Sequence, residues 1–400
     1  SNNSLGRVQT PVLAAISRRY RERENHISSD SWPIYISLQK DGILFKMRRT
    51  QDLPDKESAT MFFQDCKLAH QAQITGISHS VKEILPPDLL DLTQLQKEAN
   101  IRYGFTASEV YDIAQSLYEK KLISYPRTSS RYLTEDVLDS LSPIMARLLS
   151  WELFPAAKGT GGIDISSLSR HVINAEKANV HHAIIITGIR PGNMSEKEMQ
   201  VYRLVAGRML ETFMAPCRIE TTNVEAVCAA QHFKAEQTRI IEAGWHDVFM
   251  RSDMVPKSGY SVNELPEVEK SDTLNVCGCN MVHKKQLPVN PFTDAELVEY
   301  MEQNGLGTVS SRTNIIRTLV NRKYIRYSGK YIVPTPKGMF TYETIRGKKI
   351  ADTSLTADWE KQLAGLESGM ITGQDFLNRI RTLAKEMTDD IFNTYSTKEE

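Results

Sequence analysis

A tyrosine followed by a proline and two arginines is the feature of this sequence best suited to covalent chemistry. It lies in the run Ser124-Tyr125-Pro126-Arg127-Thr128-Ser129-Ser130-Arg131-Tyr132. Pro126 disfavours helix at Tyr125 and holds it in an extended conformation. Arg127, Arg131 and the nearby hydroxyl groups are donors that suit a phosphate. A phenol is a weak nucleophile unless cations stabilise its charged form. The segment therefore predicts either a nucleophile beside a phosphate or a buried structural tyrosine beside solvated arginines.

Two further clusters could bind a metal or move protons. His181 and His182 are adjacent in a predicted strand, where neighbouring side chains point to opposite faces and make a poor chelate. They indicate either one functional histidine or two structural ones. Cys277-Gly278-Cys279 is the closest pair among five cysteines, and it lacks the second pair or the histidines of a zinc site. We therefore predict no metal site. The odd cysteine count without framework spacing is typical of a reducing interior.

The elements that would position these residues alternate between sheet and helix. Residues 33–50 alternate in hydropathy as two strands around Lys40-Asp41-Gly42, and residues 60–84 and 218–290 are also predicted to be strand-rich. Helices are predicted in between, with threonine N-caps at several starts and Gly104 at one end. The predicted N-caps are Thr10, Thr106, Thr293 and Thr308, and a further helix is predicted over 195–214.

Two predicted helices followed by a hairpin at Tyr324–Val333 describe a winged-helix unit near the carboxyl end. The run Glu119-Lys-Lys-Leu-Ile-Ser-Tyr125 is similar to Asn321-Arg-Lys-Tyr-Ile-Arg-Tyr327, and each follows a predicted helix. Two related helix-turn-helix-like units would explain this similarity, and coincidence would explain it equally well.

Composition sets only broad limits. The 400 residues suffice for two to four domains, and no apolar run approaches the roughly 20 residues that a membrane span needs. Lys+Arg and Asp+Glu both number 49, so the net charge is zero. Nucleic-acid binders are usually basic, so a function on DNA must rest on local arrangement.

Segments along the chain resemble, in the same order, the motifs of type IA DNA topoisomerases of the bacterial topoisomerase III kind. Leu122–Leu133 resembles the family's active-site pattern Leu-Ile-Ser/Thr-Tyr-Pro-Arg, and Gly305–Ile316 resembles its Gly-Ile/Leu-Gly-Thr groove segment. The remaining similar segments are Ser4–Leu13, Pro86–Ala99, His181–Ile185 and Leu355–Glu360.

The resemblance implies a mixed α+β, multidomain fold: winged-helix-like, CAP-like helical domains joined by a β-rich arch into a toroidal core. It places residues 1–35 and 289–400 in a helical DNA-groove domain. Residues 36–88 and 216–288 would form the arch and hinge, and residues 89–215 the helical domain that carries the nucleophilic tyrosine.

The resemblance also implies the chemistry. Tyr125 would attack a phosphodiester of single-stranded DNA and form a 5′-phosphotyrosine, with strand passage and religation and without ATP. Arg127 would stabilise the phosphate and His181 would contribute to cleavage. The residues expected to contact DNA are Arg7, Gln9, Thr10, Arg131, Thr308, Ser311 and Arg312.

In the family, a Toprim domain supplies the magnesium ligands, which are a glutamate and an Asp-x-Asp-x-Glu cluster. We do not find this cluster in the sequence. Family order places them upstream of Ser1, so we expect Mg²⁺ for the whole enzyme, none in this chain, and little activity from this chain alone. The resemblance further implies a monomer that acts on single-stranded DNA in the bacterial cytoplasm, near the nucleoid or a plasmid, without a membrane.

Three positions depart from the family pattern: Ser129 replaces an aspartate, and Ile186 and Val309 replace prolines. Ser129 removes a charge near the expected site. The alternative function, favoured by the missing acidic cluster, is a non-catalytic module that binds single-stranded DNA.

Overall fold

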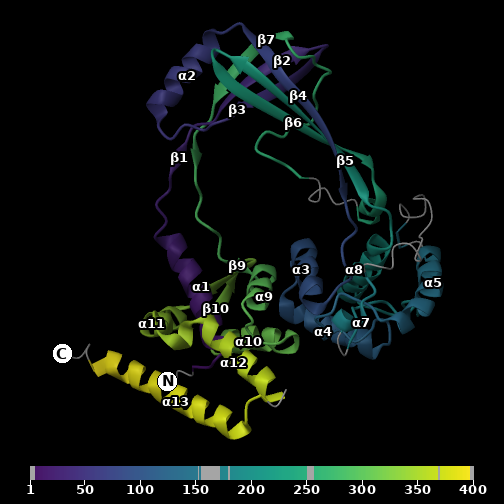
Figure 1. Cartoon of the computed structure of the whole chain (residues 1–400), viewed down its shortest axis with the longest axis vertical. Coiled ribbons are helices and arrows are strands. Elements are labelled where there is room, and N and C mark those ends of the chain that lie inside the picture. Colours follow the sequence, from purple (N-terminus) through teal and green to yellow (C-terminus); the bar gives the residue numbers. More distant parts are fainter. Residues whose placement is uncertain are drawn as a thin grey trace.

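The computed structural model describes residues 5–151, 153–154, 172–178, 181–249, 256–367 and 370–396. Helices and strands gather in three groups (Figure 1). A β-barrel lies at one end of the molecule, and two helical groups lie side by side at the other. This is the mixed α and β, multidomain class that the sequence predicted.

Six antiparallel strands close the barrel in the order β2-β3-β6-β5-β4-β7. Side chains such as Ile34, Ile36 and Leu38 alternate into its core, as strand periodicity requires. The long strands β4 and β5 pair as far as Ile84 and Cys217, and they reach down from the barrel as a ribbon (Figure 1). The six strands are β2 (Ile34–Lys40), β3 (Ile43–Arg49), β4 (Gln71–Ile84), β5 (Cys217–Cys228), β6 (Gln231–Glu242) and β7 (Thr273–Met281).

The prediction of strand over residues 60–84 is wrong in its first part. Helix α2 (Lys56–Leu68) begins after Asp55, whose side chain accepts a hydrogen bond from the Ser58 amide at 2.7 Å. Ala59 and Cys66 are buried two turns apart on the face that packs against the barrel. Asp55 is an N-cap signal that the hydropathy pattern concealed.

The first helical group carries Tyr125. Its helices share one cluster of buried apolar side chains that includes Leu95, Val110, Leu148 and Tyr202. Thr106 and Glu109 form the predicted capping box. The helices are α3 (Leu92–Tyr103), α4 (Ala107–Glu119), α5 (Glu135–Ser150), α7 (Ala175–Ala178) and α8 (Glu196–Thr212), with the 3-10 turn η3 (Gly244–Val248) beside them.

The second helical group contains the first and the last helix of the chain, α1 and α13. The predicted caps Thr293 and Thr308 start its helices α9 and α10, but Thr10 is not an N-cap: α1 begins at Gln9, and Thr10 lies inside its first turn. A three-stranded sheet of order β10-β11-β9 completes the predicted helix, helix, hairpin order. The elements are α1 (Gln9–Glu24), β9 (Phe292–Thr293), α9 (Asp294–Gln303), α10 (Val309–Asn321), β10 (Ile325–Ser328), β11 (Tyr331–Pro334), α11 (Pro336–Ile345), η5 (Lys349–Ala351), α12 (Thr353–Glu367) and α13 (Gly373–Ser396).

The two similar sequence runs have the same backbone geometry. Helices α4 and α10 are each followed by a lysine with a φ of 59°, Lys121 and Lys323. The next residue donates its amide to the carbonyl five positions earlier, Leu122 to Leu117 and Tyr324 to Leu319, both at 2.9 Å. This agreement supports two related units rather than coincidence.

Each group touches the other two. The strands β1 (Asp30–Ser31) and β8 (Lys284–Lys285) pair between the α1 group and the barrel, and the β4–β5 ribbon joins the barrel to the α3 group. The helical groups meet at α3 and α9, where Lys97 Nζ lies 2.6 Å from Glu299 Oε1. The groups thus follow one another around the molecule (Figure 1), which is the order of contacts that a toroidal core requires.

Candidate active site

Tyr125 lies where α4 gives way to an extended segment. Lys121 turns the chain through a left-handed residue, and two buried apolar residues then anchor the segment in the core. The Ser124 amide donates to the Ile185 carbonyl at 2.8 Å. This pairing places the tyrosine segment directly beside the segment that carries His181.

The rings of Tyr125 and His181 are in contact. Their centroids lie 4.4 Å apart with planes at 40°, and Tyr118 of α4 packs edge-on against Tyr125 at 5.5 Å. The Thr128 hydroxyl donates to the His181 carbonyl at 2.9 Å, which ties the two segments together on the other side of Tyr125. The structure therefore brings together two residues that the sequence proposed from separate motifs.

Arg127 is held against α4 by neutral groups. Its Nη2 donates to Gln115 Oε1 at 3.0 Å, and its guanidinium lies 5.0 Å from the Tyr111 ring centre. Its Nε is buried and has no hydrogen-bond partner among the described residues. Because no carboxylate among the described residues pairs with this guanidinium, it is available to bind an incoming anion. Sequence reasoning missed Tyr111 and Gln115, although their i, i+4 spacing places them on one helix face.

Arg127 also lines a cavity of about 390 Å³ between the two helical groups. Ser129 accompanies it from the tyrosine segment, and the amino-terminal turn of α10 forms the other side. A helix amino terminus offers unpaired amides and a partial positive charge to an anion. The lining residues are Arg127, Ser129, Thr308, Val309, Ser310 and Arg312.

The predicted DNA contacts in and just before α1 are engaged with their own chain. The Arg7 guanidinium lies 5.5 Å from the Trp359 ring centre, and Gln9 Oε1 accepts a hydrogen bond from Arg322 at 2.9 Å. Thr10 is 2% exposed, and its hydroxyl accepts from the Gly6 amide, so this residue is poorly placed for a DNA contact. On α10, Ser311 Oγ accepts from the Thr308 amide at 2.8 Å.

The family model for DNA topoisomerase matches residues 1–378. This chain belongs to that family. It is 30% identical to DNA topoisomerase 3 of Bacillus licheniformis over 97% of this chain and 56% of the relative. It is also 30% identical to DNA topoisomerase 3 of Bacillus subtilis, over 98% of this chain and 57% of the relative. The identity to DNA topoisomerase 1 of Methanocaldococcus jannaschii is likewise 30%, over 99% of this chain and 50% of the relative. The chain thus spans about half the length of the curated relatives that it matches.

The fold is that of solved topoisomerases. Full-length topoisomerase I from Thermotoga maritima superposes with a TM-score of 0.74 at 24% sequence identity, over 97% of this chain and 63% of that one. The sequence resemblance to type IA topoisomerases is therefore confirmed at the level of family and fold.

Two arginines predicted to contact DNA connect parts of this topoisomerase core. Arg131 Nε lies 2.7 Å from Asp91 Oδ2, and burial raises the pKa of Asp91 although the arginine acts in the opposite direction. Arg312 Nη1 lies 3.1 Å from Glu302 Oε1 and donates to the Thr93 hydroxyl at 3.0 Å. These contacts favour a positioning role for Arg131, whereas Arg312 also lines the cavity.

The departures from the topoisomerase pattern fall in two places. Ser129 is exposed and Val309 partly buried, and both line the cavity beside Arg127. Ile186 is fully buried and bridges the backbone of Ile123. The loss of the aspartate at Ser129 thus changes the charge at the cavity, while the loss of the proline at Ile186 affects core packing.

The described residues do not fit the family's magnesium ion. They contain no group of three or more histidine, cysteine, aspartate or glutamate side chains able to hold a metal. We therefore derive no step of the chemistry through a metal from this chain. Within the same part of the chain, no helix is both long and apolar enough to cross a bilayer.

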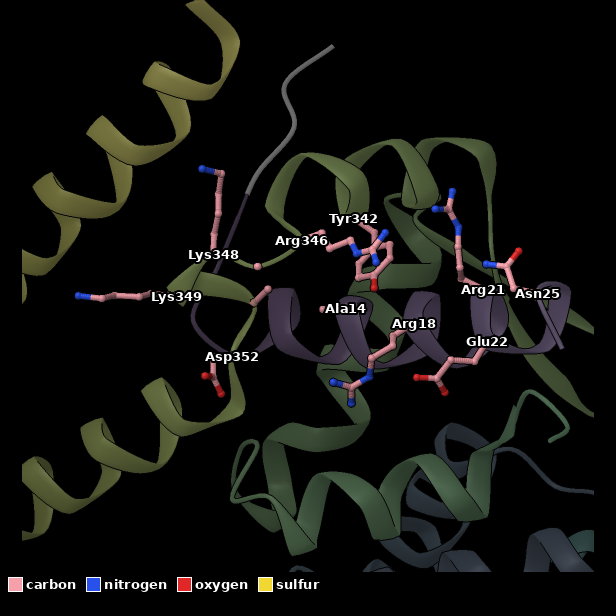
Figure 2. Close-up of a pocket in the computed structure, with 12 residues that line it drawn as sticks. Ala14, Arg18, Arg21, Glu22, Asn25, Tyr342, Arg346, Lys348, Lys349 and Asp352 are labelled. Carbon is pink, nitrogen blue, oxygen red and sulfur yellow. The ribbon is translucent and has the colours of Figure 1, made fainter. Parts of the chain in front are cut away.

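A larger cavity of about 760 Å³ lies along α1 (Figure 2). Several cationic side chains line it, but neighbouring carboxylates pair with three of them. Arg21 pairs with Glu343 at 3.0 Å, Lys348 with Asp390 at 2.9 Å, and Lys349 with Glu386 at 3.6 Å. None of the predicted site residues lines this cavity, so it is not the candidate active site.

Proposed function

We propose that this chain is the strand-cleaving and gate-forming core of a type IA DNA topoisomerase, with Tyr125 as its nucleophile. The observation that carries the proposal is the contact of Tyr125 with His181. Two residues after Tyr125 stands Arg127, whose Nε has no hydrogen-bond partner among the described residues. That arginine lines a cavity which the amino terminus of α10 completes.

The chemistry follows from these positions. The Tyr125 oxygen attacks the phosphorus of a phosphodiester and forms a 5′-phosphotyrosine, while the bond to the 3′ oxygen breaks and that oxygen leaves as a hydroxyl. Arg127 and the α10 amides stabilise the added negative charge of the transition state. His181 orients the phenol and assists its proton. The ester conserves the bond energy, so religation needs no ATP.

The division into three domains is part of the proposal. Three separate clusters of buried side chains support it, one in each helical group and one in the barrel. Residues 1–35 and 289–400 form the groove domain, 36–88 and 216–288 the arch, and 89–215 the tyrosine domain. Separation of α3 and α4 from α9 and α10 would open a gate, and the barrel and its ribbons would act as the hinge.

The substrate class and the surroundings are also proposed. The substrate is single-stranded DNA, which would follow the groove past Arg7, Gln9, Thr308, Ser311 and Arg312. The whole enzyme would be monomeric, act in the bacterial cytoplasm, and use Mg²⁺ bound outside the residues described here.

The decisive experiment uses Tyr125→Phe in the complete gene product that carries this chain. A labelled single-stranded oligonucleotide should form a covalent adduct with the native protein and none with Tyr125→Phe, while binding affinity stays within about twofold. Tyr118→Phe is the matched control, since its ring packs on Tyr125 at 5.5 Å without a proposed part in the reaction. An adduct that survives in Tyr125→Phe and is lost in another variant would disprove the assignment.

The second candidate function is binding of single-stranded DNA without cleavage. The lack of a metal-binding group among the described residues favours it for the chain alone. Titration of oligonucleotide binding against salt, with adduct formation measured in parallel, separates the two. Binding that weakens steeply with salt and never yields an adduct, with Mg²⁺ and in the complete gene product, would support the binding module.

A further inference from the structure

Three cysteines from distant parts of the sequence meet at one end of the barrel. Cys66 lies near the end of α2, Cys228 ends β5, and Cys279 is in β7. Helix α2, which carries Cys66, packs against strand β7, which carries Cys279. Independently, Cys279 Sγ lies 3.9 Å from the carbonyl of Phe63, one helical turn before Cys66. All three belong to, or pack against, the same buried cluster.

A bulge decides which cysteine of the Cys277-Gly278-Cys279 run faces inward. Residues two apart in a regular strand share a face, so both cysteines would point the same way. The register of β2 against β7 shifts between Ser37 and Leu38, where Ser37 pairs with Gly278 and Leu38 with Val276. Cys277 is left exposed on the outer face, while Cys279 is half-buried against α2.

The thiols differ in reactivity and access. The hydrogen bond with Cys66 lowers the pKa of Cys279, which is also the only one of the three with access to solvent. Cys228 acts to lower the pKa of Cys66, but Cys279 and burial outweigh it and raise that pKa to about 11. An accessible, more acidic thiol beside a second thiol is the arrangement found in peroxide-sensing cysteine pairs.

We propose that Cys279 and Cys66 form an oxidation-sensitive pair, with hydrogen peroxide as the oxidant. The Cys279 thiolate attacks one peroxide oxygen and becomes a sulfenic acid, and the other oxygen leaves and takes a proton to form water. The Cys66 sulfur then attacks the Cys279 sulfur, a second water leaves, and a disulfide remains. Two thiols are oxidised and one peroxide is reduced. The disulfide would tie α2 to β7 across the barrel end.

The test is peptide mapping of the folded chain after treatment with hydrogen peroxide, followed by alkylation with iodoacetamide and digestion without reductant. The expected product is a linked pair of peptides containing Cys66 and Cys279, which a reductant separates. The chain supplies its own controls: exposed Cys277 and buried Cys217 should remain unlinked. Peroxide treatment that links neither Cys66 nor Cys279, or that links Cys66 to Cys228 instead, would overturn the proposed pair.

Variants make the order of events visible. Cys66→Ser should abolish the cross-link and leave a Cys279 sulfenic acid that dimedone captures. Cys277→Ser should leave the yield of the cross-link unchanged within about twofold. Dimedone capture at Cys277 in place of Cys279 would contradict the assignment of Cys279 as the reacting thiol.

Discussion

At the scale of single residues, the surroundings of a tyrosine decide its chemistry. Tyr125 and Tyr327 occupy equivalent positions after α4 and α10, in the two runs that resemble each other. Tyr125 contacts His181, and two residues after Tyr125 stands Arg127, whose Nε has no hydrogen-bond partner among the described residues. The Tyr327 hydroxyl donates to Asp294 Oδ1 at 3.1 Å, and burial raises its pKa. These surroundings support Tyr125, and not Tyr327, as the proposed nucleophile.

His181 offers the sharpest test at this scale. His181→Asn removes the ring that contacts Tyr125, so formation of the covalent DNA adduct should slow by about 10²-fold, as for loss of a general acid–base group. Binding of the oligonucleotide should change little. The measurement is the rate of adduct formation under single-turnover conditions.

His182→Asn is the matched control, because among the described residues the His182 ring hydrogen-bonds the Ala183 carbonyl at 2.7 Å, whereas the ring in contact with Tyr125 is that of His181. Equal losses in both variants would indicate a general effect on the strand and remove the special role of His181.

At the scale of elements, capping boxes were reliable signals, whereas helices defined by a short buried face or by a single capping residue were harder to locate. The capping boxes at Thr106 and Thr293 act within four residues, so the sequence located these helix starts correctly. The helix at Lys56–Leu68 was missed because its buried face is short and its partner is a distant barrel. The prediction of Thr10 as an N-cap was wrong. Thr10 lies inside the first turn of α1, and its hydroxyl accepts a hydrogen bond from the Gly6 amide, which precedes the helix.

The left-handed residue after α10 leads to a stability prediction. Lys323 has a φ of 59° and an exposed side chain, and such a conformation costs a non-glycine residue about 1 kcal/mol. Lys323→Gly should therefore raise the free energy of unfolding by about that amount. Chemical denaturation followed by circular dichroism measures it. Lys330→Gly, at an exposed hairpin position with ordinary φ, should lower stability instead, and a gain there would contradict the explanation.

At the scale of the whole molecule, the junction between the helical groups is rich in polar contacts. Gln96 donates to Thr313 at 2.9 Å, and Lys97 pairs with Glu299. Asp294 of α9 accepts from the Ala107 amide of α4 at 3.2 Å. Exposing polar contacts to water costs less free energy than exposing apolar packing, because water replaces the lost hydrogen bonds. Such a junction can therefore separate while each helical group keeps its own core.

Asp294, at this junction, leads to a prediction about how stability depends on pH. Burial raises its pKa from 3.8 to about 6, against the hydrogen bonds from Ala107 and Tyr327. A raised acid pKa contributes stability below the unfolded value that is lost as pH rises through the folded value. Stability should therefore fall between about pH 4 and pH 6 by up to about 3 kcal/mol relative to Asp294→Asn.

Denaturation of both proteins at several pH values measures this difference. Tyr327→Phe removes a hydrogen bond that favours the charged carboxylate, so it should move the decline to higher pH. A difference between native protein and Asp294→Asn that stays constant from pH 4 to pH 7 would rule out this account.

The ion pair between α3 and α9 tests the strength of the closed junction. Lys97→Glu places two carboxylates where Lys97 and Glu299 now pair, and both side chains are about one-third exposed. The pair contributes at most about 1 kcal/mol, so amide exchange at α9 should accelerate by up to about fivefold. The charge-swapped double variant Lys97→Glu with Glu299→Lys should restore the native rate. Failure of the swap to restore it would show that packing, not charge, holds the junction.

The sequence by itself determined the family, the order of its motifs, most helix starts and the identity of the proposed nucleophile. These depend on local signals: the Pro after Tyr125, the threonine caps and the spacing of residues within each motif. Only the tertiary structure decided which distant groups meet. It placed His181 against Tyr125, α10 beside Arg127, and Arg131 in an ion pair with Asp91. It also turned Cys279, not Cys277, toward Cys66. The physical reason is that strand register and helix packing sum over many weak contacts distant in sequence, which no local pattern records.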